Sequence, residues 1–165
     1  MKRLKLLLIP IALLLLASCA PRYTRVYVGV PNNEIIQVFE PGRGQGAIYH
    51  LGENIDFRVK TSQTGYLTFT VIDPDGRVYE LERNVFIQAG QLTYFPNSST
   101  QAGSLSLVPP RGHHRVRVSF TSSQTDVNRV NYVNINGEAN WNNTIQSDIQ
   151  YSNLRDVAET WFFIE

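Results

Sequence analysis

The feature that most constrains the fold is a pair of alternating segments joined by a tight turn. In Gly65–Ile72, apolar and polar side chains alternate as they do along a β-strand with one buried face. Asp73-Pro-Asp-Gly76 follows and suits a type I turn with proline at its second position. Because Val78–Leu81 then returns as a second strand, residues 65–82 predict an antiparallel hairpin. Its buried face carries Leu67, Phe69 and Val71.

Further short strands are predicted along most of the remaining chain. They lie near residues 25–30, 55–60, 85–88, 92–95, 104–108, 114–121 and 157–164. Short strands at this spacing, with turn residues between them, indicate a mainly β chain folded as an antiparallel β-sandwich. The last strand is apolar on both faces, so we expect it to be buried and to close the domain. We assign the aromatic core to Phe57, Phe69, Phe120, Trp161 and Phe163.

One short helix is predicted near the C-terminus, over about residues 140–151. Trp141, Ile145 and Ile149 stand four residues apart, which places them on one face of a helix. The other positions of this segment are mostly polar, so the helix is expected to bury that single face.

Three segments of the predicted sandwich together resemble a known family. They are Asn54-Ile-Asp-Phe57, Gly65-Tyr66 and Asp73-Pro-Asp-Gly-Arg-Val-Tyr79. In this order, over about residues 53–122, they resemble the bacterial domain of unknown function 4384, which recurs in lipoproteins and other envelope proteins. The resemblance implies an immunoglobulin-like β-sandwich and a location in the cell envelope. It implies no catalytic residues, because the family has no established activity.

The N-terminus resembles the signal of a bacterial lipoprotein. Lys2, Arg3 and Lys5 precede an apolar run, and the run ends in Leu16-Ala-Ser-Cys19, which resembles a lipobox. The resemblance implies cleavage before Cys19 and attachment of lipid to its thiol. The apolar run spans about 13 residues, whereas a transmembrane helix needs roughly 20. Cys19 is the only cysteine, and lipidation explains an unpaired thiol in an exported protein.

These patterns divide the chain into three parts. We expect a lipoprotein signal peptide over residues 1–18, a lipidated tether over 19–25, and one β-sandwich domain over 26–165. Ala20 follows the cysteine where an aspartate favours retention in the inner membrane of many diderm bacteria, so we expect an outer-membrane anchor. Without residues 1–18 the chain has 12 basic and 14 acidic residues, a formal net charge of −2. This balance argues against nucleic acid as a partner.

Two patterns that resemble ligand sites have simpler explanations. Asp73 and Asp75 lack the further acidic residues and the closing glutamate of an EF-hand calcium loop, so we interpret them as turn residues. Gly42-Arg-Gly-Gln-Gly46 departs from the phosphate-binding fingerprint, and we interpret it as a surface loop that can contact a partner. No Gly-x-Ser-x-Gly motif is present. The sequence favours a non-enzymatic function and leaves an enzymatic one open.

Two functional hypotheses remain at this point. The first is a lipid-anchored interaction module that binds outer-membrane or surface-layer proteins. Because tyrosine and arginine favour protein interfaces, its candidate contact residues are Arg43, Tyr66, Tyr94 and Tyr132. The alternative is a copper-type metal or redox site built from His50, His113 and His114. That site requires the backbone to bend before His113, because neighbouring residues of a strand point to opposite faces. The interaction module needs no cofactor, whereas the alternative would use copper.

Overall fold

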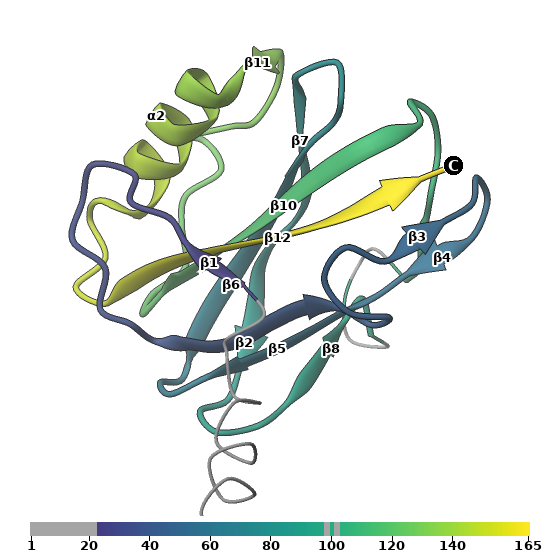
Figure 1. The fold of residues 1–165 in the computed structure, drawn as a ribbon. Coiled ribbons are helices and arrows are strands. Elements are labelled where there is room, and N and C mark those ends of the chain that lie inside the picture. The colour runs from purple at the N-terminus through teal and green to yellow at the C-terminus, as the bar shows by residue number, and fades with distance from the viewer. Residues whose placement is uncertain (1–22, 98–99, 101–102) are drawn as a thin grey trace, which may run out of the picture.

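The computed structural model describes residues 23–97, 100 and 103–165. Two sheets lie face to face, and helix α2 (Glu138–Ile149) covers the outer face of the larger sheet (Figure 1). The protein is mainly β with antiparallel sheets and one short helix near the C-terminus, consistent with the β-sandwich that the sequence predicts. Among the described residues, no helix is long and apolar enough to cross a membrane.

The larger sheet has seven strands in the described part of the chain. Six of them follow one another in the order β1 (Thr24–Arg25), β12 (Arg155–Ile164), β10 (Gly112–Thr121), β6 (Gly65–Ile72), β7 (Arg77–Ile87) and β11 (Ile135–Asn136). The seventh, β3 (Ile48–Tyr49), pairs with β12 in parallel, whereas the other pairs are antiparallel. The predicted hairpin is confirmed, because β6 and β7 are joined by the turn at residues 73–76.

The smaller sheet lies across the core from the larger one. Its strands follow the order β2 (Ile36–Pro41), β5 (Phe57–Thr61) and β8 (Thr93–Phe95). A separate short pair, β4 (Asn54–Ile55) with β9 (Leu105–Ser106), lies at one end of the sandwich. Backbone hydrogen bonds from Gly52 and Leu107 extend this pairing beyond the two strands.

The main core fills the space between the two sheets. Leu67, Phe69 and Val71 point into it, as the alternation of β6 predicts, and Phe69 stacks on Phe95 of the smaller sheet with ring centroids 3.9 Å apart. Phe57 also belongs to this core and is 1% exposed. Burial of one such side chain stabilises the fold by roughly 1.5–3 kcal/mol, so this cluster is what holds the sheets together.

A second core lies between the larger sheet and α2. Trp141, Ile145 and Ile149 are fully buried there, which confirms the predicted buried face of the helix. They pack against the outward side of the larger sheet, including Val157 of β12. The sheet is therefore covered on both faces under the helix, where Val157 is the outward apolar residue of β12.

The strand predictions missed the short strands β3 and β11 and were also wrong elsewhere. The strand expected over residues 25–30 is only β1, and it lies within the expected tether, so the sheet already begins at Thr24. Strand β2 was not predicted, because a register shift between Ile36 and Val38 interrupts its alternation. The strands expected over residues 78–81 and 85–88 form one strand, β7, with a bulge at which Asn84 adopts a φ of 57°.

Candidate functional site

Among the described residues, the structure does not bring together the three histidines of the predicted metal site. Within the described residues, no group of three His, Cys, Asp or Glu side chains could hold a metal ion. His113 and His114 occupy successive positions of β10, so their side chains point to opposite faces of the sheet. His50 is exposed, and its ring lies 3.7 Å from Glu53. Both histidines lie within the extended strand β10, which starts at Gly112, so the segment before it does not bring their rings together.

His114 lies in an apolar environment on the inner face of β10. Its ring stacks on Phe162 of β12, with centroids 5.3 Å apart and planes 13° from parallel. Nδ1 lies 3.1 Å from the Gly112 carbonyl oxygen, the one hydrogen bond that the ring makes among the described residues. Because burial disfavours the charged ring, it lowers the pKa of His114 below 6.5. His114 is therefore a neutral imidazole at pH 7.

A pocket of about 320 Å³ opens beside His114, at the end of the sandwich that holds the β4–β9 pair. We call it the end pocket. Phe57, Val71, Val116 and Phe162 form its floor. The segment Leu105–Pro110 forms one wall and is held by the backbone bonds between Gly52, Glu53 and Leu107. Concave, mostly apolar pockets of this size are typical of small-molecule sites.

Ser106, Asp73 and Tyr79 also bring polar side chains to the end pocket, and the Ser106 hydroxyl donates a hydrogen bond to the Gly52 carbonyl oxygen at 3.4 Å. The Asp73 carboxylate accepts a hydrogen bond from the Arg77 backbone at 2.9 Å and one from the Tyr79 hydroxyl at 3.1 Å. The Arg77 guanidinium lies 3.3 Å from the same carboxylate. Partial burial and the bond to Asp73 raise the pKa of Tyr79 above 10. These contacts confirm that Asp73 acts as a turn residue, and its charge is already balanced within the hairpin.

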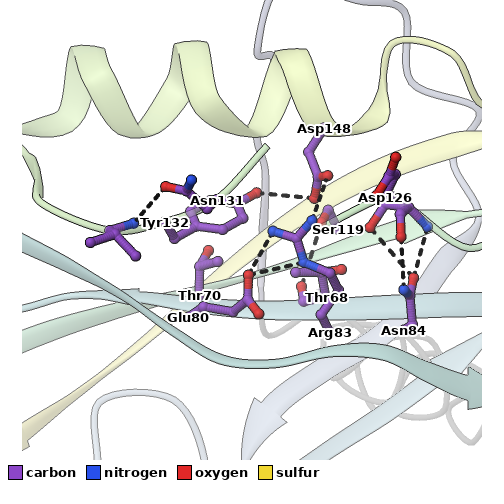
Figure 2. Close-up of polar contacts among 12 residues, drawn as sticks. Thr68, Thr70, Glu80, Arg83, Asn84, Ser119, Asp126, Asn131, Tyr132 and Asp148 are labelled. Atoms are coloured by element: carbon purple, nitrogen blue, oxygen red, sulfur yellow. Dashed lines mark hydrogen bonds and ion pairs between the residues drawn. The ribbon is translucent and has the colours of Figure 1, made fainter. Parts of the chain in front are cut away.

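Arg83 fixes α2 to the larger sheet from the bulge of β7 (Figure 2). Its guanidinium bonds Glu80 at 2.7 Å and Asp148 of α2 at 3.1 Å. The side chains of Arg83 and Asp148 are 6% and 0% exposed. Tyr132 donates a hydrogen bond to the same Asp148 carboxylate at 3.4 Å, and burial raises the pKa of Asp148. The bulge is itself held by Asn84, which exchanges hydrogen bonds with the Thr125 backbone.

A second buried arginine holds the start of the same helix. Arg117 of β10 is 1% exposed and lies 3.9 Å from the centroid of Trp141. It bonds Glu159 at 2.7 Å and Glu138 at 3.0 Å. Burial lowers the pKa of Arg117, but two carboxylates compensate its charge. Both arginine networks have a structural role, since their partners are residues that attach the helix.

An aromatic cluster lies on the outer face of β10 and β12, and we define it as the aromatic patch (Ile48, His113, Trp161 and Phe163). The rings of His113, Trp161 and Phe163 contact one another with centroids 5.1–5.5 Å apart. Phe163 is 37% exposed and Ile48 is 50% exposed. The assignment of Trp161 and Phe163 to the core was therefore wrong. Phe162 and Ile164 are the residues of this segment that point into the core.

The glycine-rich loop packs against this aromatic patch. The Gly46 backbone donates a hydrogen bond to the Trp161 carbonyl at 2.9 Å, and a Cβ on Gly46 would lie 2.6 Å from the Trp161 ring. Arg43 of the same loop is exposed, bonds Glu53 at 3.0 Å and lies 4.6 Å from the Tyr49 ring centroid. Arg43 thus lies on a loop that contacts the patch.

The other predicted contact residues are dispersed. Tyr66 packs on Phe86 and pairs with Thr121, at the opposite end of β10 from His113. Tyr94 is 49% exposed but belongs to the smaller sheet. Tyr132 is only 5% exposed, because it lies beneath α2 next to Arg83, so its expected surface position was wrong. Cys19 lies outside the described residues.

The fold and these sites define a mainly β domain, consistent with a sandwich, whose larger sheet carries a helix on its outer face. Residues 48–124 match the model of a family described as a domain of unknown function (DUF4384). This match confirms the resemblance to the domain that the sequence shows. No curated protein and no solved structure matches the chain.

The match divides the sites between two parts of the chain. It runs from β3 through β10, and so includes all of the end pocket except Phe162 and Ile164. Helix α2 and strand β12 lie beyond it, and with them lie Trp161 and Phe163 of the aromatic patch. The alternation of residues 161–164 separates the inward from the outward side chains. This alternation does not indicate which of the outward side chains helix α2 covers.

Proposed function

We propose that this protein is a lipid-anchored protein of the bacterial outer membrane and that its β domain binds another envelope protein. The anchor is Cys19, and binding is non-enzymatic: the lipid holds the domain at the membrane while its surface contacts the partner. The proposal is supported by the lipobox-like Leu16-Ala-Ser-Cys19 and by the family of residues 48–124.

The observation that carries the binding role is the aromatic patch. Trp161, Phe163 and His113 present contiguous rings on a sheet face that α2 leaves uncovered at this end. Aromatic side chains are enriched at the centres of protein interfaces, because they bury a large area with few rotatable bonds. Arg43 lies on the adjoining loop and adds a charged group at the rim. The formal charge of −2 on the chain from Cys19 onward favours a protein over a nucleic acid as the partner.

The anchor is tested by labelling cells with a radioactive fatty acid. We expect the full chain to take up label and to sediment with outer membranes. Cys19→Ala should take up no label and leave the membrane fraction. Equal labelling of both chains would show that Cys19 is not the lipidated residue.

The patch is tested with a photo-cross-linking phenylalanine analogue placed at position 163 in intact envelopes. The control carries the same analogue at Tyr151, which is 69% exposed outside the patch. We expect a discrete cross-linked protein from position 163 only, and we expect Trp161→Ala to weaken it. Identical products from both positions, or none from position 163, would contradict the proposed interface.

A further inference from the structure

The end pocket is a second candidate site, separate from the aromatic patch. The two lie on opposite faces of β10 and β12, because Phe162 points into the pocket whereas Trp161 and Phe163 point outward. Elsewhere in the described chain, a groove beside Arg83 is lined by β7 and residues 127–136, and it carries the charged side chains of Arg77, Glu80 and Arg83. The end pocket differs from that groove because its floor is part of the main hydrophobic core.

The floor of the end pocket determines the chemistry of the part of a ligand that lies against it. Phe57, Val71, Val116 and Phe162 offer only apolar surface, so a charged group placed against them would lose its hydration without compensation. The volume of about 320 Å³ corresponds to roughly ten non-hydrogen atoms, at the ~30 Å³ that one water molecule occupies in the liquid. A short alkyl chain has this size and this chemistry.

The polar groups of the end pocket determine which functional group the alkyl ligand carries at its end. The Asp73 carboxylate is already bonded by Tyr79 and Arg77, so it does not require a cation from a ligand. The His114 ring directs Nδ1 to the Gly112 carbonyl, which places the proton of the neutral ring on Nδ1. Nε2 is then an acceptor, and it has no hydrogen-bond partner among the described residues. His114 lines the end pocket, so a ligand bound there lies next to its ring.

We propose that the end pocket binds an uncharged alkyl compound whose terminal hydroxyl donates a hydrogen bond to Nε2 of His114. The alkyl part fills the space between Phe57, Phe162 and the Leu105–Pro110 wall. The stacking of His114 on Phe162 holds the acceptor in place before the ligand arrives, so that little ordering of the protein is required. This site does not depend on the envelope partner proposed above.

The test uses four probes of nearly equal size that differ in their polar end. These are 1-octanol, 1-methoxyheptane, octanoate and octylammonium, each titrated at pH 7.5 into the full chain carrying Cys19→Ser, which cannot be lipidated at that residue. Binding is followed through the methyl NMR signals of the isotope-labelled protein. We expect saturable shifts with 1-octanol at Val71, Leu107 and Val116, which line the pocket. Val133, which is 68% exposed and lies outside the pocket, should not shift.

The probe series and two variants test the role of His114. His114→Phe keeps an aromatic ring on Phe162 but removes the acceptor, so it should weaken 1-octanol binding about five- to tenfold. The affinity for 1-methoxyheptane, which has no hydrogen-bond donor, should be equally weak in His114→Phe and in the unmutated chain. The matched control Phe163→Ala changes the aromatic patch and should leave 1-octanol binding unchanged.

Several results would overturn the proposal. Absence of saturable shifts with 1-octanol in the unmutated pocket would show that the pocket takes no alkyl ligand. Shifts confined to residues of the aromatic patch would place the binding elsewhere. Tighter binding of octanoate or octylammonium than of 1-octanol would show that the pocket does not prefer an uncharged ligand with a hydroxyl donor. Equal affinity of His114→Phe and the unmutated chain for 1-octanol would remove His114 from the site.

Discussion

Replacing Asp148 with alanine should loosen α2 from the larger sheet. In the folded chain the Asp148 carboxylate lies 3.1 Å from the Arg83 guanidinium, and neither side chain has appreciable contact with water. The substitution also removes the acceptor for the Tyr132 hydroxyl. What remains is an arginine at the bulge of β7 that is still buried and keeps only Glu80, whose side chain is 31% exposed.

The size of the effect follows from this uncompensated charge. Removing one partner of a buried ion pair costs about 3–5 kcal/mol. Because Arg83 keeps Glu80, we expect the lower end, about 3 kcal/mol. With a urea m-value of about 2 kcal/mol/M, this loss lowers the unfolding midpoint by about 1.5 M. Since domains are stable by only about 5–15 kcal/mol, the change is large.

The assay is urea unfolding at pH 7 of the full chain carrying Cys19→Ser. Unfolding is followed by tryptophan fluorescence, because Trp141 lies on the buried face of the same helix. Asn143→Ala is the matched control, since Asn143 lies on the exposed face of α2 and should shift stability by less than about 0.5 kcal/mol. The double variant Arg83→Leu/Asp148→Leu removes both charges and should recover most of the loss.

The comparison of single and double variants decides the outcome. If Asp148→Ala moves the midpoint no further than Asn143→Ala, the pair does not hold the helix. The single variants Arg83→Leu and Asp148→Leu complete the comparison. If the double variant loses as much stability as these two single variants together, the two side chains are not coupled, and the explanation by an unpaired buried charge is wrong.

Three further predictions concern other parts of the molecule. Burial lowers the pKa of His114 in the folded chain below its unfolded value of 6.5, so below pH 6.5 the unfolded chain binds more protons than the folded one. The contribution of neutral His114 to the free energy of unfolding should therefore be complete above pH 6.5 and be lost as the pH falls through the folded pKa. His114→Phe should flatten this fall in denaturation curves from pH 7.5 to 5, whereas His50→Ala should leave it in place. Gly65→Ala would put a Cβ 2.5 Å from the Thr121 carbonyl oxygen and should cost about 1–3 kcal/mol in urea unfolding, a cost absent if the backbone relaxes freely. Copper titration should reveal no stoichiometric site that is lost in His113→Ala/His114→Ala, because the rings of these two residues point to opposite faces; such a site would reinstate the three-histidine hypothesis.

Much of the fold could be predicted because its signals are local. The alternation of Gly65–Ile72 placed Leu67 and Phe69 on the buried face, and the turn at residues 73–76 set the hairpin. The four-residue spacing of Trp141 and Ile145 likewise gave the buried face of α2. In each case the period of the pattern equals the period of the backbone, so no distant residue is needed.

The candidate sites were harder to predict, because they depend on contacts between distant segments. The end pocket brings His114 beside Leu107 and Phe162, and no spacing along the chain indicates that enclosure. Tyr132 was expected at the surface, but α2 and Arg83 cover it. Arg83 itself reaches Asp148 from a bulge, a local irregularity that breaks the alternation from which strands are recognised.

The sequence by itself determined a mainly β chain with a short helix near the C-terminus, the hairpin of β6 and β7, and the resemblance of about residues 53–122 to a domain of unknown function. Only the tertiary structure decided which faces are covered. Trp161 and Phe163 have the same alternation and hydrophobicity as Phe162 and Ile164, yet the first two contact solvent and the others form core. The reason is that alternation assigns a side chain to a face, whereas burial requires a second layer, and α2 covers only part of the outer one.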